Sequence, residues 1–137
     1  MIGIKILPLK KIKTKKGNIY KFLSRNDKFY KKFGEIYFTE IKKNSEKGWN
    51  FHTKNKCHIS VIKGKVKFHF LKKNRKIFKS KKITLSSKNH KMIIIEPEIY
   101  FSFKGFDNFN LIANFLEKPH SKNESKKFEV VNNIKIK

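Results

Sequence analysis

The sequence Lys47-Gly48-Trp49-Asn50-Phe51-His52, continued to Gly64, carries the rarest side chains of this protein. It contains the single tryptophan, the single cysteine at Cys57 and two of the five histidines, the second being His58. Apolar and polar residues alternate before a turn centred on Gly64, and they alternate again over residues 66–70. Two alternating runs joined by a glycine-centred turn predict a β-hairpin. A histidine, a thiol and a tryptophan in this setting suggest one wall of a pocket.

The length of 137 residues predicts a single domain, residues 1–137, with one core. One cysteine cannot form an internal disulfide, which favours a reducing compartment. The apolar run over residues 1–8 is too short for a signal peptide, and no run has the length of a membrane span. We therefore expect a soluble, cytoplasmic protein without a membrane partner.

The net charge of +25 invites a nucleic-acid interpretation, but the kind and distribution of the charge argue against it. Arg25 and Arg75 are the only arginines, so 33 of the 35 basic residues are lysines, which lack the fork geometry used in base readout. The charge is also spread along nearly the whole chain. Lysine, asparagine, isoleucine and phenylalanine are enriched together, as an AT-rich coding sequence would produce. Specific nucleic-acid binding is therefore not expected, although weak, salt-sensitive attraction of polyanions is.

Short apolar runs separated by turn signals follow one another along the chain. A clear strand is expected over residues 35–41, and a tight corner at 96–98 precedes another strand over 99–103. Further strands are expected over residues 19–23, 76–85, 92–95, 110–116 and 128–131. No segment of useful length has an apolar period of 3.6 residues. Many short strands spaced by roughly ten residues predict an all-β sandwich or barrel.

The stretch from Asn50 to Gly64 resembles the first motif of the cupin fold, a double-stranded β-helix or jelly-roll barrel. That motif has a His-x-His pair, then a glutamate, then a glycine seven positions further on; the corresponding residues are Asn50, His52, Cys57 and Gly64. Residues 96–101 occupy the second motif, Pro-x-Gly-x-x-His, and end on phenylalanine instead of histidine. The resemblance implies an all-β, single-domain cupin barrel.

Metal-dependent cupins bring about three histidines and a carboxylate to one ion. The motif positions keep only one imidazole and one thiol, so we expect neither a metal nor another cofactor. Zinc bound by His52, Cys57 and His58 is the alternative, but no fourth ligand follows at a recognised spacing.

Nearly the whole chain resembles the small cupins related to dTDP-4-dehydrorhamnose 3,5-epimerase, the RmlC-like family. Four stretches carry the similarity in the same order: residues 16–19, 33–38, 47–54 and 112–124. The resemblance implies a sugar-nucleotide epimerase or isomerase acting on a dTDP-4-keto-6-deoxyhexose in surface polysaccharide biosynthesis. It also implies a homodimer to which the N-terminal strands, within residues 1–45, contribute.

The epimerase reaction needs a base that removes a proton next to a ketone and a group that stabilises or protonates the enolate. In the family the base is the first histidine of the pair, which is Asn50 here, and the assisting lysine falls at Cys57. Asparagine is no base at neutral pH, so His52 is the candidate base, with Tyr37, Tyr100 or a lysine as the acid. Asn50 and Cys57 then remain as substrate-binding candidates. Alternatively, His52 only lines a sugar site or forms a hydrogen bond within the barrel.

Further candidates for substrate binding follow from the resemblance and from residue type. Lys16 and Lys47 occupy positions where the epimerases carry arginines that contact the nucleotide diphosphate, and lysine can neutralise phosphate as a point charge. Trp49 could stack on a sugar or a base, or pack at the rim of the core. Asn114 and His120 belong to the resembling segments, although a strand-end asparagine also commonly satisfies backbone groups.

Two functions therefore remain open. The first is a sugar-nucleotide epimerase or isomerase with His52 as the base and a nucleotide sugar as the substrate. The second is a non-catalytic cupin that binds a nucleotide sugar or glycan. A basic, nucleic-acid-associated domain is a third, less favoured interpretation.

Overall fold

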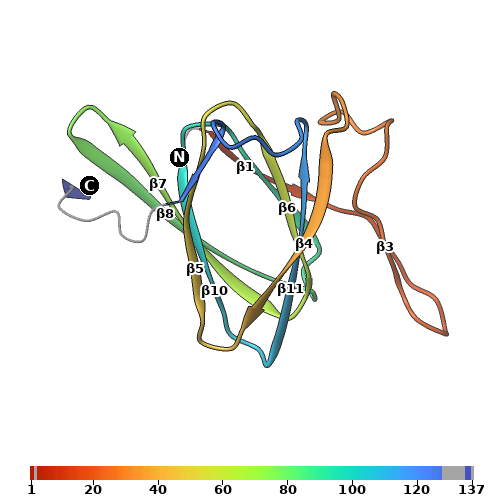
Figure 1. Ribbon diagram of the computed structural model, residues 1–137. Helices are drawn as coiled ribbons and strands as arrows, with labels where there is room; N and C mark the ends of the chain where they lie inside the picture. Colours follow the sequence, from red (N-terminus) through yellow and green to blue (C-terminus); the bar gives the residue numbers. More distant parts are fainter. Residues whose placement is uncertain (2, 128–134, 137) are drawn as a thin grey trace.

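The computed structural model describes residues 1, 3–127 and the backbone of 135–136, and every regular element in this part of the chain is a β-strand. Two large sheets face each other and a two-stranded arm projects to one side (Figure 1). The first sheet has the order β1 (Ile4–Pro8), β9 (Lys91–Ile95), β6 (Cys57–Lys63), β11 (Phe109–Leu116) and β4 (Glu35–Lys42). The second has the order β12 (Ser125–Lys127), β5 (Glu46–His52), β10 (Tyr100–Gly105), β7 (Lys65–Asn74), β8 (Ile77–Ser86) and β13 (Lys135–Ile136).

The arm pairs β2 (Lys11–Ile12) with β3 (Ile19–Tyr20). The prediction of an all-β sandwich or barrel is confirmed, and most expected strands agree with the observed ones to within two residues at each end. The exceptions are 19–23, which keeps only two strand residues, and 66–70, which continues to Asn74. The strand expected over 128–131 lies outside the described residues. Among the described residues, no helix could cross a membrane.

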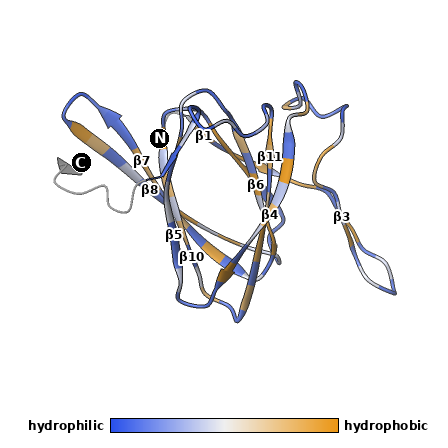
Figure 2. Cartoon of the chain, viewed as in Figure 1, coloured by the Kyte–Doolittle hydropathy of each residue, from blue (hydrophilic) through white to orange (hydrophobic). Residues whose placement is uncertain are grey.

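Alternating side chains from the two sheets form the core. Ile59 and Val61 of β6 point inward from the first sheet, and Phe68 and Phe70 of β7 belong to the same cluster from the second. Their exposed fractions lie between 0% and 2%. Burying one such side chain contributes roughly 1.5–3 kcal/mol relative to leaving it exposed. Figure 2 shows the corresponding alternation of hydrophobic and hydrophilic residues along the strands.

The predicted hairpin around Gly64 is wrong. β6 pairs with β9 and β11 in the first sheet, whereas β7 pairs with β8 and β10 in the second, so the turn connects the two sheets. Alternation has the same period in both cases, which is why the sequence cannot distinguish a hairpin from a crossover. Gly64 has a φ of +86°, and its Cα faces the backbone of Phe109 and the side chain of Asn110.

We expect Gly64→Ala to destabilise the fold by about 2–4 kcal/mol, because the new methyl group would combine left-handed backbone strain with a clash against Phe109 and Asn110. Urea unfolding measures this loss. Gly17→Ala is the matched control, because Gly17 has a φ of +135° but no heavy atom within 4 Å of the place that a methyl group would occupy. Equal losses in the two variants would contradict the steric explanation.

The segment between the arm and β4 covers the outer face of the first sheet. The ring of Phe29 lies 5.6 Å from that of His58, and the rings of Tyr30 and Phe33 stack on Phe115 at 5.8 and 6.0 Å. His58 and Phe115 are therefore fully buried although they point away from the core.

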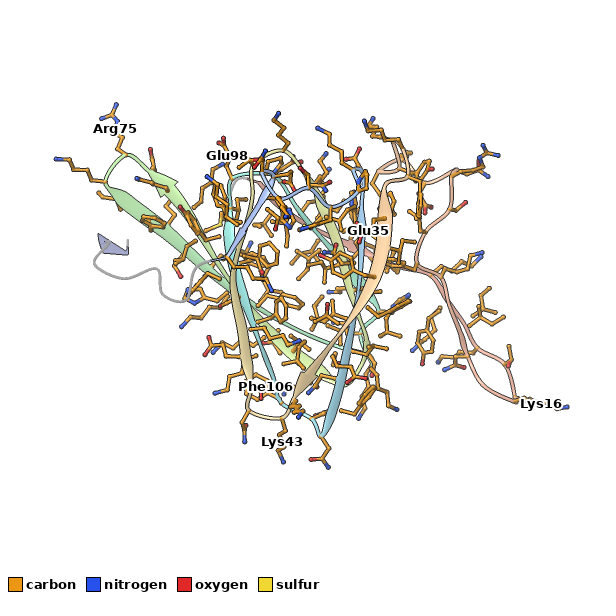
Figure 3. All side chains as sticks on the ribbon, viewed as in Figure 1. Lys16, Glu35, Lys43, Arg75, Glu98 and Phe106 are labelled. Atoms are coloured by element: carbon orange, nitrogen blue, oxygen red, sulfur yellow. The ribbon has the colours of Figure 1, made fainter. Side chains whose placement is uncertain are left out.

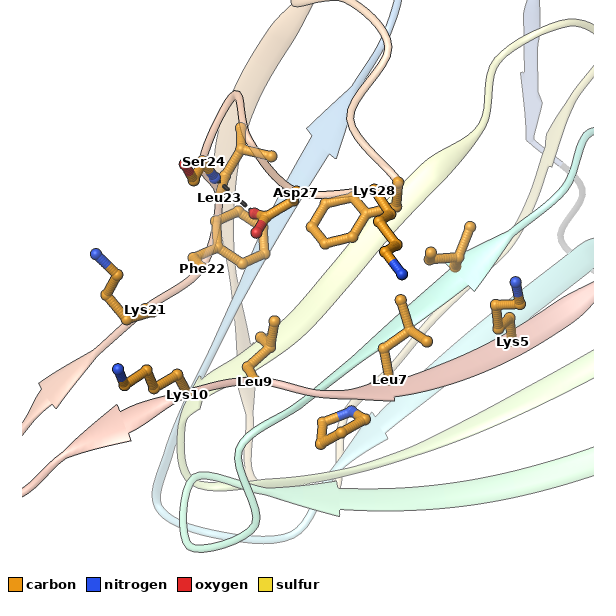
Figure 4. Close-up of a pocket in the computed structure, with 13 residues that line it drawn as sticks. Lys5, Leu7, Leu9, Lys10, Lys21, Phe22, Leu23, Ser24, Asp27 and Lys28 are labelled. Atoms are coloured by element: carbon orange, nitrogen blue, oxygen red, sulfur yellow. Dashed lines mark hydrogen bonds between the residues drawn. The ribbon is translucent and has the colours of Figure 1, made fainter.

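An apolar hollow of about 580 Å³ lies between β1 and the segment that follows the arm (Figure 4). Leu7 and Leu9 line it from one side, and Phe22 and Leu23 line it from the other. Nearby, the arm exposes its own apolar side chains: Ile12 (37%), Ile19 (52%) and Tyr20 (44%). An apolar hollow beside exposed apolar side chains is a surface suited to association.

Candidate functional site

A cavity of about 560 Å³ lies between the two sheets. Its apolar lining consists of Ile59, Phe101, Phe103, Ile112 and Leu116. Its polar lining consists of Glu35, Tyr37, Thr39, Glu46, Lys47, Asn50, His52, Asn55, Asn114, His120, Glu124, Ser125 and Lys127. An apolar cavity with convergent polar groups is the usual setting of a small-molecule site.

His52, the last residue of β5, is held by a carboxylate from a distant part of the chain. Its Nδ1–H donates a hydrogen bond of 2.7 Å to Oε1 of Glu124, and both residues are buried. The second oxygen, Oε2 of Glu124, accepts the backbone N–H groups of Lys54 at 3.1 Å and Asn55 at 2.9 Å. An ionised carboxylate only accepts hydrogen bonds, so Nδ1 carries a proton, and in the neutral imidazole Nε2 then carries the lone pair that a base needs.

Glu124 is ionised in this arrangement. Burial alone raises the pKa of its carboxyl group, but hydrogen bonds from His52 and from the backbone of Asn55 and Lys54 outweigh burial, so the pKa lies below its ordinary value. A carboxylate that orients an imidazole in this way fixes the tautomer and stabilises the imidazolium once a proton has been taken up.

Tyr37 reaches the cavity from β4, directly opposite Asn114 of β11. Nδ2 of Asn114 donates a hydrogen bond of 3.1 Å to the Tyr37 hydroxyl, and Oδ1 accepts the backbone N–H of His58 at 3.2 Å. Burial, then the nearby Cys57 thiol, raises the pKa of Tyr37 to about 12. Because its oxygen already accepts from Asn114, the phenol keeps a proton that it can donate to a ligand.

The geometry of the site and the fold can be compared with known proteins. No known protein family matches the sequence, and no curated protein matches it. The fold matches the crystal structure of a dTDP sugar isomerase from Desulfovibrio desulfuricans G20, with a TM-score of 0.90, 24% identity, and coverage of 96% of this chain and 87% of that one.

Two further solved structures have the same fold. One is a His-to-Asn variant of the 3,4-ketoisomerase QdtA from Thermoanaerobacterium thermosaccharolyticum in complex with TDP-4-keto-6-deoxyglucose (TM-score 0.79, 16% identity, 92% of this chain and 88% of that one). The other is the 3,5-epimerase RmlC from Legionella pneumophila in complex with dTDP-4-keto-L-rhamnose (TM-score 0.79, 13% identity, 100% and 84%). In fold, this chain is an RmlC-like cupin.

The cavity brings together several residues that the sequence singled out: Tyr37, Lys47, Asn50, His52, Asn114 and His120. Asn50 and His52 lie two positions apart on β5, so they face the same side of the strand. The backbone N–H of His120 donates a hydrogen bond of 2.9 Å to Oε2 of Glu35, whose place on β4 is labelled in Figure 3.

Four predicted site residues do not line the cavity: Tyr100, Trp49, Lys16 and Cys57. Tyr100 is the neighbour of Phe101 on β10 and points to the opposite face, where its ring lies 4.6 Å from Phe51. The Trp49 ring meets that of His69 edge-on at 5.0 Å. Lys16 lies at the far end of the arm (Figure 3). Of the two predicted tyrosines, Tyr37 therefore remains as the phenol that lines the same cavity as His52.

Cys57 and His58 do not join His52 either. The Cys57 thiol is fully buried, and burial raises its pKa to about 12, so it stays protonated. His58 points to the outer face, its Nδ1–H donating to the carbonyl oxygen of Phe115 at 3.0 Å. The alternative zinc site is therefore not assembled, and no group of three His, Cys, Asp or Glu side chains suited to a metal occurs within the described residues.

Sequence reasoning gave no role to Glu124, which lies 72 positions from His52, or to Asn55. The amide of Asn55 pairs with the backbone of Lys118, donating from Nδ2 to the carbonyl oxygen at 2.8 Å and accepting at Oδ1 at 3.2 Å. This pair ties the loop after β5 to the loop that leads to Glu124. The charge of Glu124 could have indicated a role in the site, because it is one of only ten acidic residues in a strongly basic chain.

Proposed function

We propose that this RmlC-like cupin is a sugar-nucleotide isomerase or epimerase, acting on a dTDP-4-keto-6-deoxyhexose bound in the cavity. The observation that carries the proposal is the buried hydrogen bond of 2.7 Å between His52 and Glu124 in a cavity of sugar-accepting size. A histidine oriented by a carboxylate is the arrangement that general-base catalysis requires. The fold shared with enzymes of dTDP sugars supports the substrate class.

The reaction follows from the positions of two groups. Nε2 of His52 takes the proton from the carbon next to the ketone, and the electrons of that C–H bond move into an enolate. The Tyr37 hydroxyl donates a hydrogen bond to the enolate oxygen, which lowers the energy of the developing charge. Delivery of a solvent proton to the opposite face of the same carbon gives an epimer. Return of the proton from His52 to the former carbonyl carbon gives an isomeric ketone when the hydroxyl of the deprotonated carbon passes its own proton to the enolate oxygen and becomes the new carbonyl group.

The second candidate function is non-catalytic binding of a nucleotide sugar or glycan. It is favoured by Asn50, which stands where the resembling epimerases carry their base. Asn50 faces the cavity and can hydrogen-bond a sugar but cannot accept a proton at neutral pH.

Deuterium wash-in separates the two functions. The protein is incubated with dTDP-4-keto-6-deoxyglucose in D₂O, and deuterium at the sugar carbons next to the ketone is followed by NMR. The enzyme proposal requires exchange above the rate without protein. Binding of the sugar nucleotide without any exchange would establish the non-catalytic function instead.

Lysines supply the charge for the diphosphate. Lys47 and Lys127 line the cavity, whereas Lys16 is separated from it by the length of the arm. A contact between Lys16 and a diphosphate therefore requires that the arm reach the cavity of a second copy. We propose a homodimer in which the arm, with its exposed Ile19 and Tyr20, packs on the partner.

Ile19→Asp is expected to raise the dimer dissociation constant by roughly 100-fold, because it removes an apolar contact and would bury a charge. Light scattering at micromolar concentration measures the change as a shift from dimer to monomer. Phe106→Asp is the control, because Phe106 is also exposed (37%) but lies at the lower end of the barrel in Figure 3, away from the arm that projects to the right. A monomeric parent protein would contradict the dimer.

A further inference from the structure

The outer half of the β7–β8 hairpin is one of the strongly basic segments of the chain. Seven of the eleven residues from 72 to 82 are lysine or arginine, and none is acidic. The hairpin projects to the left side of the barrel in Figure 1, with Arg75 at its tip (Figure 3). We call this segment the basic ribbon; its cationic residues are Lys72, Lys73, Arg75, Lys76, Lys79, Lys81 and Lys82.

The basic ribbon presents cations on both of its faces. Lys72 lies directly opposite Lys79 in the strand register, and Lys81 is on the same face two positions along. Lys73 and Lys82 lie on the other face. Like charges directly opposite one another destabilise a strand pair, and a bound polyanion would reduce that repulsion.

Two hollows on the ribbon have cationic linings. One, of about 780 Å³, is lined by Lys72, Lys73, Lys79 and Lys81 together with Met1, Asn74 and Ser80. The other, of about 550 Å³, is lined by Asn74, Arg75, Lys76, Ile77 and Lys79. By contrast, the barrel cavity has three carboxylates and two lysines, so the positive charge of this protein is not uniform.

Lys73, Lys76 and Lys79 of the basic ribbon form no ion pair with a described residue. In the described part of the chain, ion pairs join His52 to Glu124 and Lys56 to Glu96, and neither includes Lys73, Lys76 or Lys79. Exposed ammonium groups in such an array attract phosphates with little demand on geometry.

We propose that the basic ribbon binds duplex nucleic acid without sequence preference, its two faces turned toward the two phosphate backbones that border a groove. The major groove is about 12 Å wide and admits a β-ribbon whose strands are about 4.8 Å apart. A flat anionic membrane would contact one face only, and so would a single strand. Predominance of lysine over arginine fits phosphate contacts rather than base readout.

The test uses fluorescence anisotropy of labelled duplex DNA with the full chain. The ribbon variant combines Lys73→Gln, Lys76→Gln, Lys79→Gln and Lys82→Gln. The control combines Lys42→Gln, Lys43→Gln, Lys63→Gln and Lys65→Gln, which removes the same charge from equally exposed positions at the far end of the barrel. Circular dichroism and urea unfolding establish that both variants fold.

The ribbon variant is expected to bind duplex at least roughly tenfold more weakly than the parent at about 50 mM salt, with a salt slope smaller by about 2–4. The control is expected to change by less than about threefold. Equal weakening in both variants would overturn the proposal in favour of net charge alone. Equal affinity for duplex and single-stranded DNA would overturn the proposal that both faces of the ribbon contact the two backbones of a groove. Tighter binding to phosphatidylserine vesicles than to duplex, if it is lost in the ribbon variant, would identify a membrane as the partner instead.

Discussion

His52→Ala is expected to reduce deuterium exchange into the bound 4-keto sugar by roughly 10²–10⁴-fold, the usual contribution of a positioned general base. Among the described residues, no other buried imidazole lines the cavity. His120 lines the cavity but is exposed, and His58 and His69 point to the outer faces of the two sheets. The measurement is the rate of exchange by NMR under single-turnover conditions, which separates proton transfer from product release.

Two controls keep this result interpretable. His69→Ala removes an imidazole that packs against Trp49 outside the cavity, and it should leave exchange unchanged. Calorimetric titration with dTDP should show that His52→Ala still binds the nucleotide, since Lys47 and Lys127 remain. Exchange that survives undiminished in a folded His52→Ala variant would contradict the role of His52 as the base.

The sequence predicted the strands well because their apolar alternation reports directly which face is buried. Phe68 and Phe70, at alternate positions of β7, are fully buried, as that period requires. Which strands pair with one another was harder to predict from the sequence. The turn at Gly64 was predicted to join two strands of one sheet, but it joins two sheets, because alternation carries no information about which strand lies beside which.

The candidate site shows the same division between local and long-range information. Asn50 and His52 lie together because both belong to one strand. Glu124 reaches His52 only when β11 and the following loop have folded. The residues next to either side chain in the sequence do not predict that contact. The sequence offered Tyr37 and Tyr100 as equivalent candidates. They differ in the face of the strand to which each side chain belongs: Tyr37 faces the cavity, while Tyr100 faces away from it.

Glu124 is placed so that both of its oxygens act only as acceptors. Oε1 accepts from Nδ1 of His52, and Oε2 accepts from two backbone N–H groups, those of Lys54 and Asn55. A glutamine at this position has one acceptor oxygen and one donor amide group. It can satisfy the backbone donors only by turning its NH₂ toward Nδ1.

Glu124→Gln is therefore expected to reverse the tautomer of His52, placing the proton on Nε2 and removing the lone pair that faces the substrate. Loss of the orienting carboxylate in a serine protease triad acts in this way and costs about 10⁴-fold, so a loss of roughly 10²–10⁴-fold in exchange is expected here. Binding of dTDP should change little. Nitrogen-15 NMR of the imidazole distinguishes the two tautomers directly, a readout that a merely structural role for Glu124 would not change.

The same substitution predicts a pH dependence of stability. The pKa of Glu124 is lowered by its hydrogen bonds, so the ionised form stabilises the folded state above the unfolded pKa of about 4.3, and this contribution is lost as the pH falls through the folded value. The difference in unfolding free energy between the parent and Glu124→Gln should be largest near neutral pH and should shrink below about pH 4. A difference that is constant with pH, together with an unchanged tautomer, would show that Glu124 is not the charged partner of His52.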